Sequence, residues 1–293
     1  MIVQADKMPL SFSDQVSRLR GKGLIINDDA YAEDFLSKVN YYRLRGYYIH
    51  LHDNSIDKFD QGTTLEDIIQ TYEFDDELRI LTGRQLLKIE VNMRTQLAYR
   101  HSHEHGGLGY SCVSNFEDSD KYYEFYTNAL NEVKRSSDLH IDHFIKNHNG
   151  KIPIWSLIEI LSMTCLSKLL SNLLNPDLVY LSRIYGIPTP KMIKSNFYAL
   201  SMLRNLCAHG NRIFNRSLTI KPALDHNDCK YIPGGITNSF YAILFAMKYL
   251  SLDKSSWNNF IDNLEGLLSK YSPTIDLNCL GMPQAWKAPL IKP

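Results

Sequence analysis

The feature that most constrains the fold is a long helical repeat of apolar residues between Thr64 and Gly106. The apolar residues recur mostly in steps of three and four, the spacing of one face of an α-helix. The repeat consists of Leu65, Ile68, Ile69, Tyr72, Leu78, Leu81, Leu86, Ile89, Met93 and Leu97. Thr64 and Asp67 have the spacing of a capping box, which marks a helix start. The sequence therefore predicts one long helix or a kinked pair, with Gly83 as the weak point, that ends at Gly106-Gly107.

Most of the remaining chain has helical periodicity too. A second strong helix is expected over residues 190–208, stopped by Gly210. Further helices are expected at 12–21, 29–38, 118–135, 138–147, 154–174, 177–185, 239–251 and 256–270. Strand signals are few, since Ser217–Lys221 alternates but is short and lies in a loop-like region. The prediction is an all-α protein, with a small N-terminal helical subdomain at 1–62 and one helical domain at 63–293.

The composition is that of an ordinary globular protein, with 44% apolar and 22% charged residues among 293. Five cysteines without framework spacing suit a reducing compartment. The first residues, Met1–Pro9, contain Asp6 and Lys7 and lack the apolar core of a signal peptide. Charges also interrupt the most apolar stretches, which argues against a membrane segment. We therefore expect a cytoplasmic protein. We also expect no cofactor, because Gly21-Lys-Gly23 lacks the sequence context of a phosphate-binding loop.

The charges are balanced overall but separated along the chain. Lysine plus arginine and aspartate plus glutamate both number 32. Residues 178–224 contain seven basic residues and no acid, whereas residues 60–77 contain seven acids and no base. A purely basic stretch can present a surface that binds RNA phosphates. The alternative is that the two segments pack against each other. The candidate RNA-binding residues in the basic stretch are Lys191, Lys194, Arg212 and Arg216.

The basic stretch also holds the best catalytic candidate, an arginine and a histidine five residues apart, Arg204 and His209. On an unbroken helix the two would point about 140° apart, but a helix end at Gly210 allows the chain to turn the histidine back. The helix dipole favours a charged histidine there, which suits general acid–base catalysis. Arginine clamps phosphate oxygens, and Asn205 can orient either group. The alternative is a histidine that binds helix carbonyls beside a surface arginine.

These residue types suit RNA cleavage without a metal ion. A base removes the proton of a ribose 2′-OH, the oxygen attacks the adjacent phosphate, and arginine stabilises the transition state. The products are a 2′,3′-cyclic phosphate and a 5′-OH. DNA lacks the nucleophile, so the same chemistry cannot cut it.

Ordered motifs across most of the chain resemble the Abi family of bacterial abortive-infection proteins (the AbiD/AbiF group), a branch of the HEPN superfamily of helical nucleases and RNA-binding proteins. The segments that carry the resemblance are Lys7–Val16, Val39–Tyr47, the helix from Thr64 with Tyr72–Arg79, Glu90–Thr95, Pro153–Glu159, Tyr185-Gly186, Leu203–Arg212 and Leu280–Trp286.

The resemblance implies an R-x(4–6)-H nuclease motif, which Arg204, Asn205 and His209 match. It also implies an antiparallel helical bundle, a homodimer that joins two motifs in one cleft, and a toxin-like RNase of phage defence restrained by a structured non-coding RNA. The alternative within the superfamily is a protein that holds a structured RNA without cutting it.

Two residues of the long helix are candidates for supporting the motif. Arg94 and His101 fit the R-x6-H spacing, but Glu90 lies one turn before Arg94 and predicts an intrahelical ion pair. We therefore treat Glu90 and Arg94 as supports for the site and not as part of a second motif.

Two competing features remain. His101-Ser-His103-Glu-His105 reads as the inverted zinc-protease motif, with a third ligand from Glu124, Glu132 or Glu159, but Gly106-Gly107 follows at once. We predict no metal at the catalytic site and leave metal binding by this histidine cluster open. The segment Tyr41–Tyr48 interleaves tyrosines with Arg43 and Arg45, which is typical of a base-stacking surface or of tyrosines buried between helices. We favour buried tyrosines and RNA contact by Arg43 or Arg45.

Overall fold

A computed structural model describes residues 8–292. The expectation that the chain has no signal peptide rests on its first residues, and Met1–Lys7 lie outside the described part. The fold is all-α, as predicted. The helices are α1 (Phe12–Gly21), α2 (Asp29–Lys38), α3 (Tyr41–Tyr48), α4 (Leu65–His105), α5 (Ser119–Arg135), α6 (Leu139–Asn147), α7 (Ile154–Ile160), α8 (Met163–Ser171), α9 (Asn175–Ile184), α10 (Pro190–Ala208), α11 (His226–Cys229), α12 (Phe240–Leu250) and α13 (Lys254–Lys270). The strands β1 (His52–Asp53) and β2 (Lys58–Phe59) form a small antiparallel hairpin.

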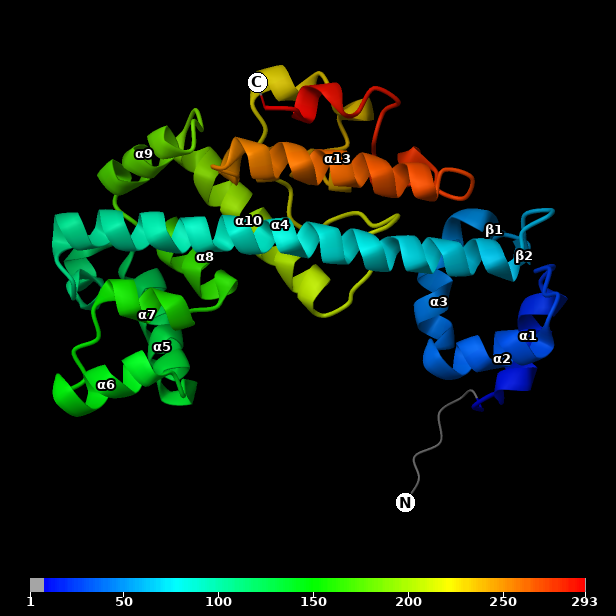
Figure 1. The fold of residues 1–293 in the computed structure, drawn as a ribbon, viewed down its shortest axis with the longest axis horizontal. Helices are drawn as coiled ribbons and strands as arrows, with labels where there is room; N and C mark the ends of the chain where they lie inside the picture. Colours follow the sequence, from blue (N-terminus) through cyan, green and yellow to red (C-terminus); the bar gives the residue numbers. More distant parts are fainter. Residues whose placement is uncertain (1–7, 293) are drawn as a thin grey trace.

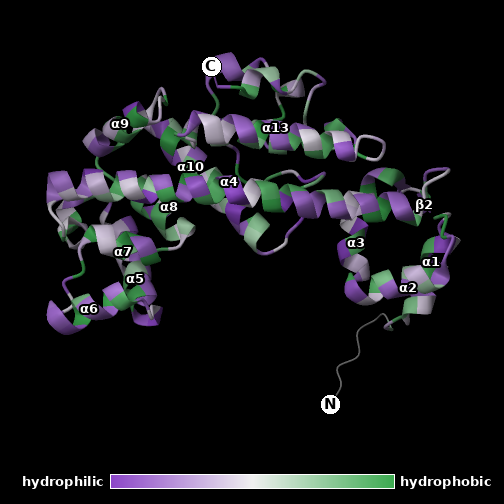
Figure 2. Cartoon of the chain, viewed as in Figure 1, coloured by the Kyte–Doolittle hydropathy of each residue, from purple (hydrophilic) through white to green (hydrophobic). Residues whose placement is uncertain are grey.

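The 41-residue helix α4 is the axis of the molecule (Figure 1). Helices α1 to α3 lie at its N-terminal end, α5 to α7 lie at the other end, and α13 runs alongside it. Helices α7, α10 and α13 make the most extensive contacts with α4. Figure 2 shows hydrophilic and hydrophobic residues interleaved along α4, as expected for a helix with different faces toward several neighbours.

The long helix begins as the sequence predicts but is not kinked. The Thr64 hydroxyl accepts a hydrogen bond from the Asp67 amide at 3.1 Å, and the Asp67 carboxylate accepts one from the Thr64 amide. The predicted weak point, Gly83, lies inside continuous helix. A Cβ atom there would lie 3.7 Å from the Cys207 Cβ, so α10 packs closely against this point. Tertiary packing thus compensates for the low helix propensity of glycine.

The prediction of one helix over residues 154–174 is wrong, because the structure breaks this segment in its middle into two helices, α7 and α8. Leu161 is extended, and the Ser162 hydroxyl caps α8 by accepting a hydrogen bond from the Cys165 amide at 3.2 Å. The carbonyls of Ile158 and Leu161 accept hydrogen bonds from the guanidinium of Arg94. A side chain from α4 therefore satisfies the end of α7, which no local pattern reveals.

Two groups of buried apolar side chains form the interior. The smaller joins α1, α2 and α3 to the first turns of α4. The larger runs from Phe74 to Leu290 and includes nearly all of α12. The division at residue 62 stays a prediction, because the small core extends into α4 as far as Ile69. Among the described helices, none combines the length and the apolar character needed to cross a membrane.

Candidate active site and RNA-binding surface

Helix α10 ends in a glycine cap at the predicted histidine. The Gly210 amide donates to the Cys207 carbonyl at 3.2 Å and the Asn211 amide donates to the Leu206 carbonyl at 2.8 Å. Gly210 has a φ of 62°, a conformation that favours glycine. The predicted stop at Gly210 is confirmed. His209 is the last residue before the turn, and its side chain is exposed.

The motif arginine is held by a carboxylate on α4. The Arg204 side chain is 32% exposed, and its Nε lies 3.5 Å from Oε2 of Glu90. Oε1 of Glu90 accepts a hydrogen bond from Arg94 at 2.5 Å, which confirms the predicted ion pair. Within residues 8–292, Oε2 of Glu90 is buried and makes no hydrogen bond. Glu90 therefore lies between Arg94 and Arg204.

Asn205 contacts the start of α8, where its Nδ2 donates to the Thr164 hydroxyl at 3.2 Å. Within the described residues, no hydrogen bond or ion pair joins Arg204 to His209. The three residues of the motif thus share the last turns of α10, but each has separate surroundings.

A groove of about 500 Å³ lies beside the motif, between α5, α8 and α10. It is lined by Thr164, the contact of Asn205, by further hydroxyls, by three lysines, and by one carboxylate and one methionine: Ser167, Ser171, Ser195, Tyr198, Lys121, Lys168, Lys194, Glu124 and Met202. Lys194 pairs with Glu117 at 3.0 Å and Lys168 pairs with Glu124 at 2.8 Å. Lys191 is exposed near the start of α10. The groove combines hydroxyl donors with cations, the groups that bind phosphate oxygens.

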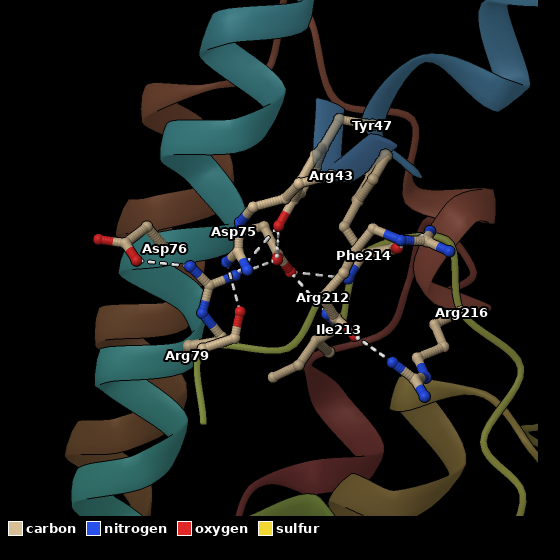
Figure 3. A network of polar contacts seen from close by, with 10 residues as sticks. Arg43, Tyr47, Asp75, Asp76, Arg79, Arg212, Ile213, Phe214 and Arg216 are labelled. Atoms are coloured by element: carbon tan, nitrogen blue, oxygen red, sulfur yellow. Dashed lines mark hydrogen bonds and ion pairs between the residues drawn. The ribbon is translucent and has the colours of Figure 1, made fainter. Parts of the chain in front are cut away.

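The segment that follows the motif is fixed by a buried network centred on Asp75 (Figure 3). Oδ1 of Asp75 accepts hydrogen bonds from the amides of Ile213 at 2.9 Å and Phe214 at 2.7 Å. Oδ2 accepts hydrogen bonds from the Tyr47 hydroxyl at 2.8 Å and from Arg79. Asp75 belongs to the acidic segment and its amide donors to the basic stretch, so the two segments do pack together at this point.

The structure turns Arg212 inward, which argues against its predicted contact with RNA. Its guanidinium donates to the carbonyls of Phe214 at 2.5 Å and Asn215 at 2.6 Å. Burial lowers the pKa of Arg212 below the usual arginine value. A Cβ atom on Gly46 of α3 would lie 2.8 Å from the Arg212 Nε. We therefore assign Arg212 to holding this segment. Arg216 is half-exposed and, within residues 8–292, its side chain donates only to the Arg212 carbonyl, at 3.4 Å.

The two arginines of α3 have different surroundings. Arg43 donates to the Gly210 carbonyl, and its guanidinium carbon lies 5.7 Å from the centre of the Tyr72 ring. Arg45 is exposed. Arg43 therefore holds the turn after His209, and only Arg45 is free to reach a ligand. Tyr47 and Tyr48 are buried, as the sequence predicts for the tyrosines of this segment, but the prediction is wrong for Tyr42, which is 70% exposed.

Cys207 lies between Arg204 and His209 but is a poor nucleophile. Burial raises the pKa of its thiol to about 12. The thiol therefore stays protonated at neutral pH, and the reactive thiolate form is not available.

The structure brings only two histidines of the competing zinc motif together: the ring centres of His101 and His105 lie 4.7 Å apart. His101 is buried, and burial is the main cause that lowers its pKa to about 4. His105 contacts Asp177 at 2.8 Å, while the Tyr99 carbonyl lies 2.8 Å from His103 Nδ1. In the part of the chain that the structure describes, no group of three or more histidine, cysteine, aspartate or glutamate side chains is arranged so that it could hold a metal ion. The protease reading therefore has no ligand set to support it.

Comparison with protein families matches residues 34–215 to the Abi-like proteins. This match covers more than half of the chain. The chain belongs to the Abi-like family. No curated protein and no solved structure matches it.

The region shared with the Abi-like family begins in α2 and ends at Asn215, so it contains both the motif and the Asp75 network. Helices α12 and α13 lie outside it. Membership suggests a role in abortive infection, a defence against phage, and is compatible with a nuclease-like role.

Proposed function

We propose that this Abi-like protein is an endoribonuclease of the HEPN type that acts in abortive infection. The observation that carries the proposal is the end of α10, where Glu90 holds Arg204 and the glycine cap leaves His209 exposed. A fixed guanidinium and an accessible imidazole are the two groups that 2′-OH attack requires.

In the proposed reaction, His209 removes the proton of a ribose 2′-OH and the oxygen attacks the adjacent phosphorus. Arg204 stabilises the charge on the phosphate oxygens, and the leaving 5′ oxygen takes up a proton. The products are a 2′,3′-cyclic phosphate and a 5′-OH. A homodimer supplies a second imidazole as the acid, and the groove with Lys194 holds the RNA backbone. A structured RNA restrains this toxin-like activity in the cytoplasm.

The first experiment compares purified wild type with Arg204→Ala and His209→Ala on total RNA. Both substitutions should abolish cleavage. His209→Ala should leave the melting temperature within about 2 °C because its side chain is exposed, whereas Arg204→Ala should lower it by a few degrees, because it removes the partner of the buried Glu90 carboxylate. The exposed His226→Ala is the matched control and should cut like wild type. An RNA with 2′-deoxyribose at the cut site should resist cleavage. Equal cleavage by wild type and His209→Ala would contradict the proposal.

The second candidate is a protein that binds RNA without cutting it. It is favoured by the separation of Arg204 and His209, which no hydrogen bond or ion pair joins within the described residues. Expression in bacteria with sequencing of RNA 5′-OH ends separates the two. New ends and growth arrest in wild type alone support the nuclease. RNA that is retained by both wild type and His209→Ala, without new ends, supports the binding protein.

A further inference from the structure

A pocket of about 640 Å³ lies between α1 and α3, away from the motif. Its lining combines three tyrosines with three basic side chains: Tyr41, Tyr42, Tyr48, Arg18, Lys22 and Arg45. Among the described residues that line it, none is acidic. We call it the α1–α3 pocket. Its volume is in the range of pockets that hold a small ligand.

The cations of the α1–α3 pocket are only partly used by the protein. Lys22 pairs with Asp57 at 2.7 Å. Arg18 and Arg45 are exposed, and within residues 8–292 neither makes an ion pair or a side-chain hydrogen bond. The nearby Arg20, in contrast, is paired with Asp29. Two guanidinium groups thus remain to bind an anion.

The tyrosines of the α1–α3 pocket offer a stacking face. Tyr42 is 70% exposed, so its ring contributes little to the core. It meets the Tyr41 ring edge-on, at 5.9 Å between centres. The Tyr41 hydroxyl is buried and has no hydrogen-bond partner among the described residues. The exposed Tyr42 ring, beside the basic side chains of the pocket, suits a flat ligand that also carries an anionic group.

We propose that the α1–α3 pocket binds a nucleotide of unpaired RNA, with the base on Tyr42 and the phosphate between Arg18 and Arg45. The inference rests on the proposed function, which makes RNA the ligand of this protein. A nucleotide has one aromatic and one anionic part, and the pocket has a matching group for each. An acidic peptide would use the arginines but not the exposed ring.

This site is separate from the motif although one helix links the two. Arg43 and Arg45 are two residues apart on α3, so they point about 160° away from each other. Arg43 contacts Gly210 and Tyr47 contacts Asp75, whereas Arg45 and Tyr42 line the pocket. RNA in the pocket therefore adds affinity at a second point and leaves the groups that react unchanged.

The test measures binding of a fluorescent 12-nucleotide unpaired RNA to full-length His209→Ala, which is proposed to bind without cutting. Adding Tyr42→Ala with Arg45→Ala should weaken binding about tenfold or more. Replacing Arg18 and Arg45 should weaken the salt dependence of binding: the magnitude of the slope of the logarithm of the association constant against the logarithm of the salt concentration should fall by about 0.7 for each residue. Exposed Tyr123→Ala with Arg135→Ala is the matched control and should bind as the parent does. Melting temperatures verify that all variants fold.

Three results would overturn the assignment. These are unchanged binding by the Tyr42 and Arg45 variant, equal affinity for a free mononucleotide, and equal displacement of the RNA by a polyglutamate peptide. The nuclease proposal fails separately, in the cleavage assay. If wild type cuts no RNA but the pocket variant binds RNA more weakly, the pocket stands and the nuclease does not. If wild type cuts and the pocket variant binds normally, only the pocket fails.

Discussion

Helix α4 carries two buried arginine–carboxylate pairs of the same spacing, Asp75–Arg79 and Glu90–Arg94. Asp75 accepts four hydrogen bonds, so both of its oxygens are satisfied. Glu90 uses one oxygen for Arg94 and leaves the other beside Arg204, with no hydrogen bond in the described structure.

The difference between the two pairs separates a structural anchor from a group with remaining capacity. A buried carboxylate whose two oxygens both accept hydrogen bonds fixes the backbone that it contacts and cannot bind a further group. An incompletely bonded carboxylate is costly for stability, and a compensating role is expected where it occurs. The Asp75 pair therefore anchors the segment after the motif, and we propose that the Glu90 pair positions the motif arginine.

The largest expected effect is on the anchor. Asp75→Ala should lower the free energy of unfolding by about 3–5 kcal/mol, because it leaves a buried arginine, a hydroxyl and two amides without their acceptor. Asp76→Ala removes the neighbouring, half-exposed partner of Arg79 and should cost less than about 1 kcal/mol. Denaturant titration of both variants measures the contrast, and equal losses would show that Asp75 is not an anchor.

Another buried polar side chain of α4, that of His101, predicts a pH dependence of stability. Burial lowers its folded-state pKa from 6.5 to about 4, so the unfolded state binds more protons between these values. The contribution of the neutral His101 side chain to the free energy of unfolding is complete above pH 6.5, declines as the pH falls to about 4, and is absent below that pH. At about 1.4 kcal/mol per pH unit the decline amounts to about 3–4 kcal/mol. Unfolding titrations of wild type and His101→Gln from pH 4 to 7 test this. Parallel pH profiles would contradict the assignment.

Glu90→Gln should separate stability from activity. The Arg94 guanidinium keeps its hydrogen bonds to the carbonyls of Ile158 and Leu161. The free energy of unfolding should therefore fall by about 1–3 kcal/mol, less than for Asp75→Ala. RNA cleavage should fall about tenfold or more, because the neutral amide holds Arg204 less firmly. Glu104→Gln, which alters the pair between the exposed Glu104 and Arg100, is the control and should retain full activity. Normal cleavage by Glu90→Gln would remove the positioning role.

The smallest effects concern two glycines with opposite expectations. Gly83 lies on α4 between the two pairs, and a Cβ there meets Cys207 at an ordinary 3.7 Å, so Gly83→Ala should stabilise by about 1 kcal/mol. Gly210→Ala should destabilise by about 1 kcal/mol because of its positive φ. Melting curves distinguish the signs, and stabilisation by Gly210→Ala would argue against the glycine cap.

The sequence predicts much of this fold because the helix boundaries have local causes. The cap at Thr64 and the stop at Gly210 need only neighbouring residues, and both are where the pattern places them. The pattern misses helix α3, whose tyrosines and Gly46 have low helix propensity. It also misses the break at Leu161, which depends on Arg94 from another helix. Long-range contacts decide these cases.

The candidate site divides in the same way. Arg204, Asn205 and His209 are found from spacing and resemblance, and the Glu90–Arg94 pair follows from its one-turn separation. Asp75 appears in the sequence only as one acid among seven. Its role depends on amides 138 and 139 residues away, and Arg212 is read as an RNA contact because the sequence does not show that it faces inward.

The distance along the chain between Asp75 and its amide partners has a consequence for the order of synthesis. The turn after His209 is held in place because the amides of Ile213 and Phe214, which follow it, donate to Asp75. The next amide, that of Asn215, donates to the carbonyl of Cys279 at 3.1 Å. A growing chain therefore holds α4 long before Ile213 and Phe214 are made, and it holds the motif helix long before Cys279 is made. The site is completed only when nearly all of the protein has been made, so unfinished chains carry the motif without its support.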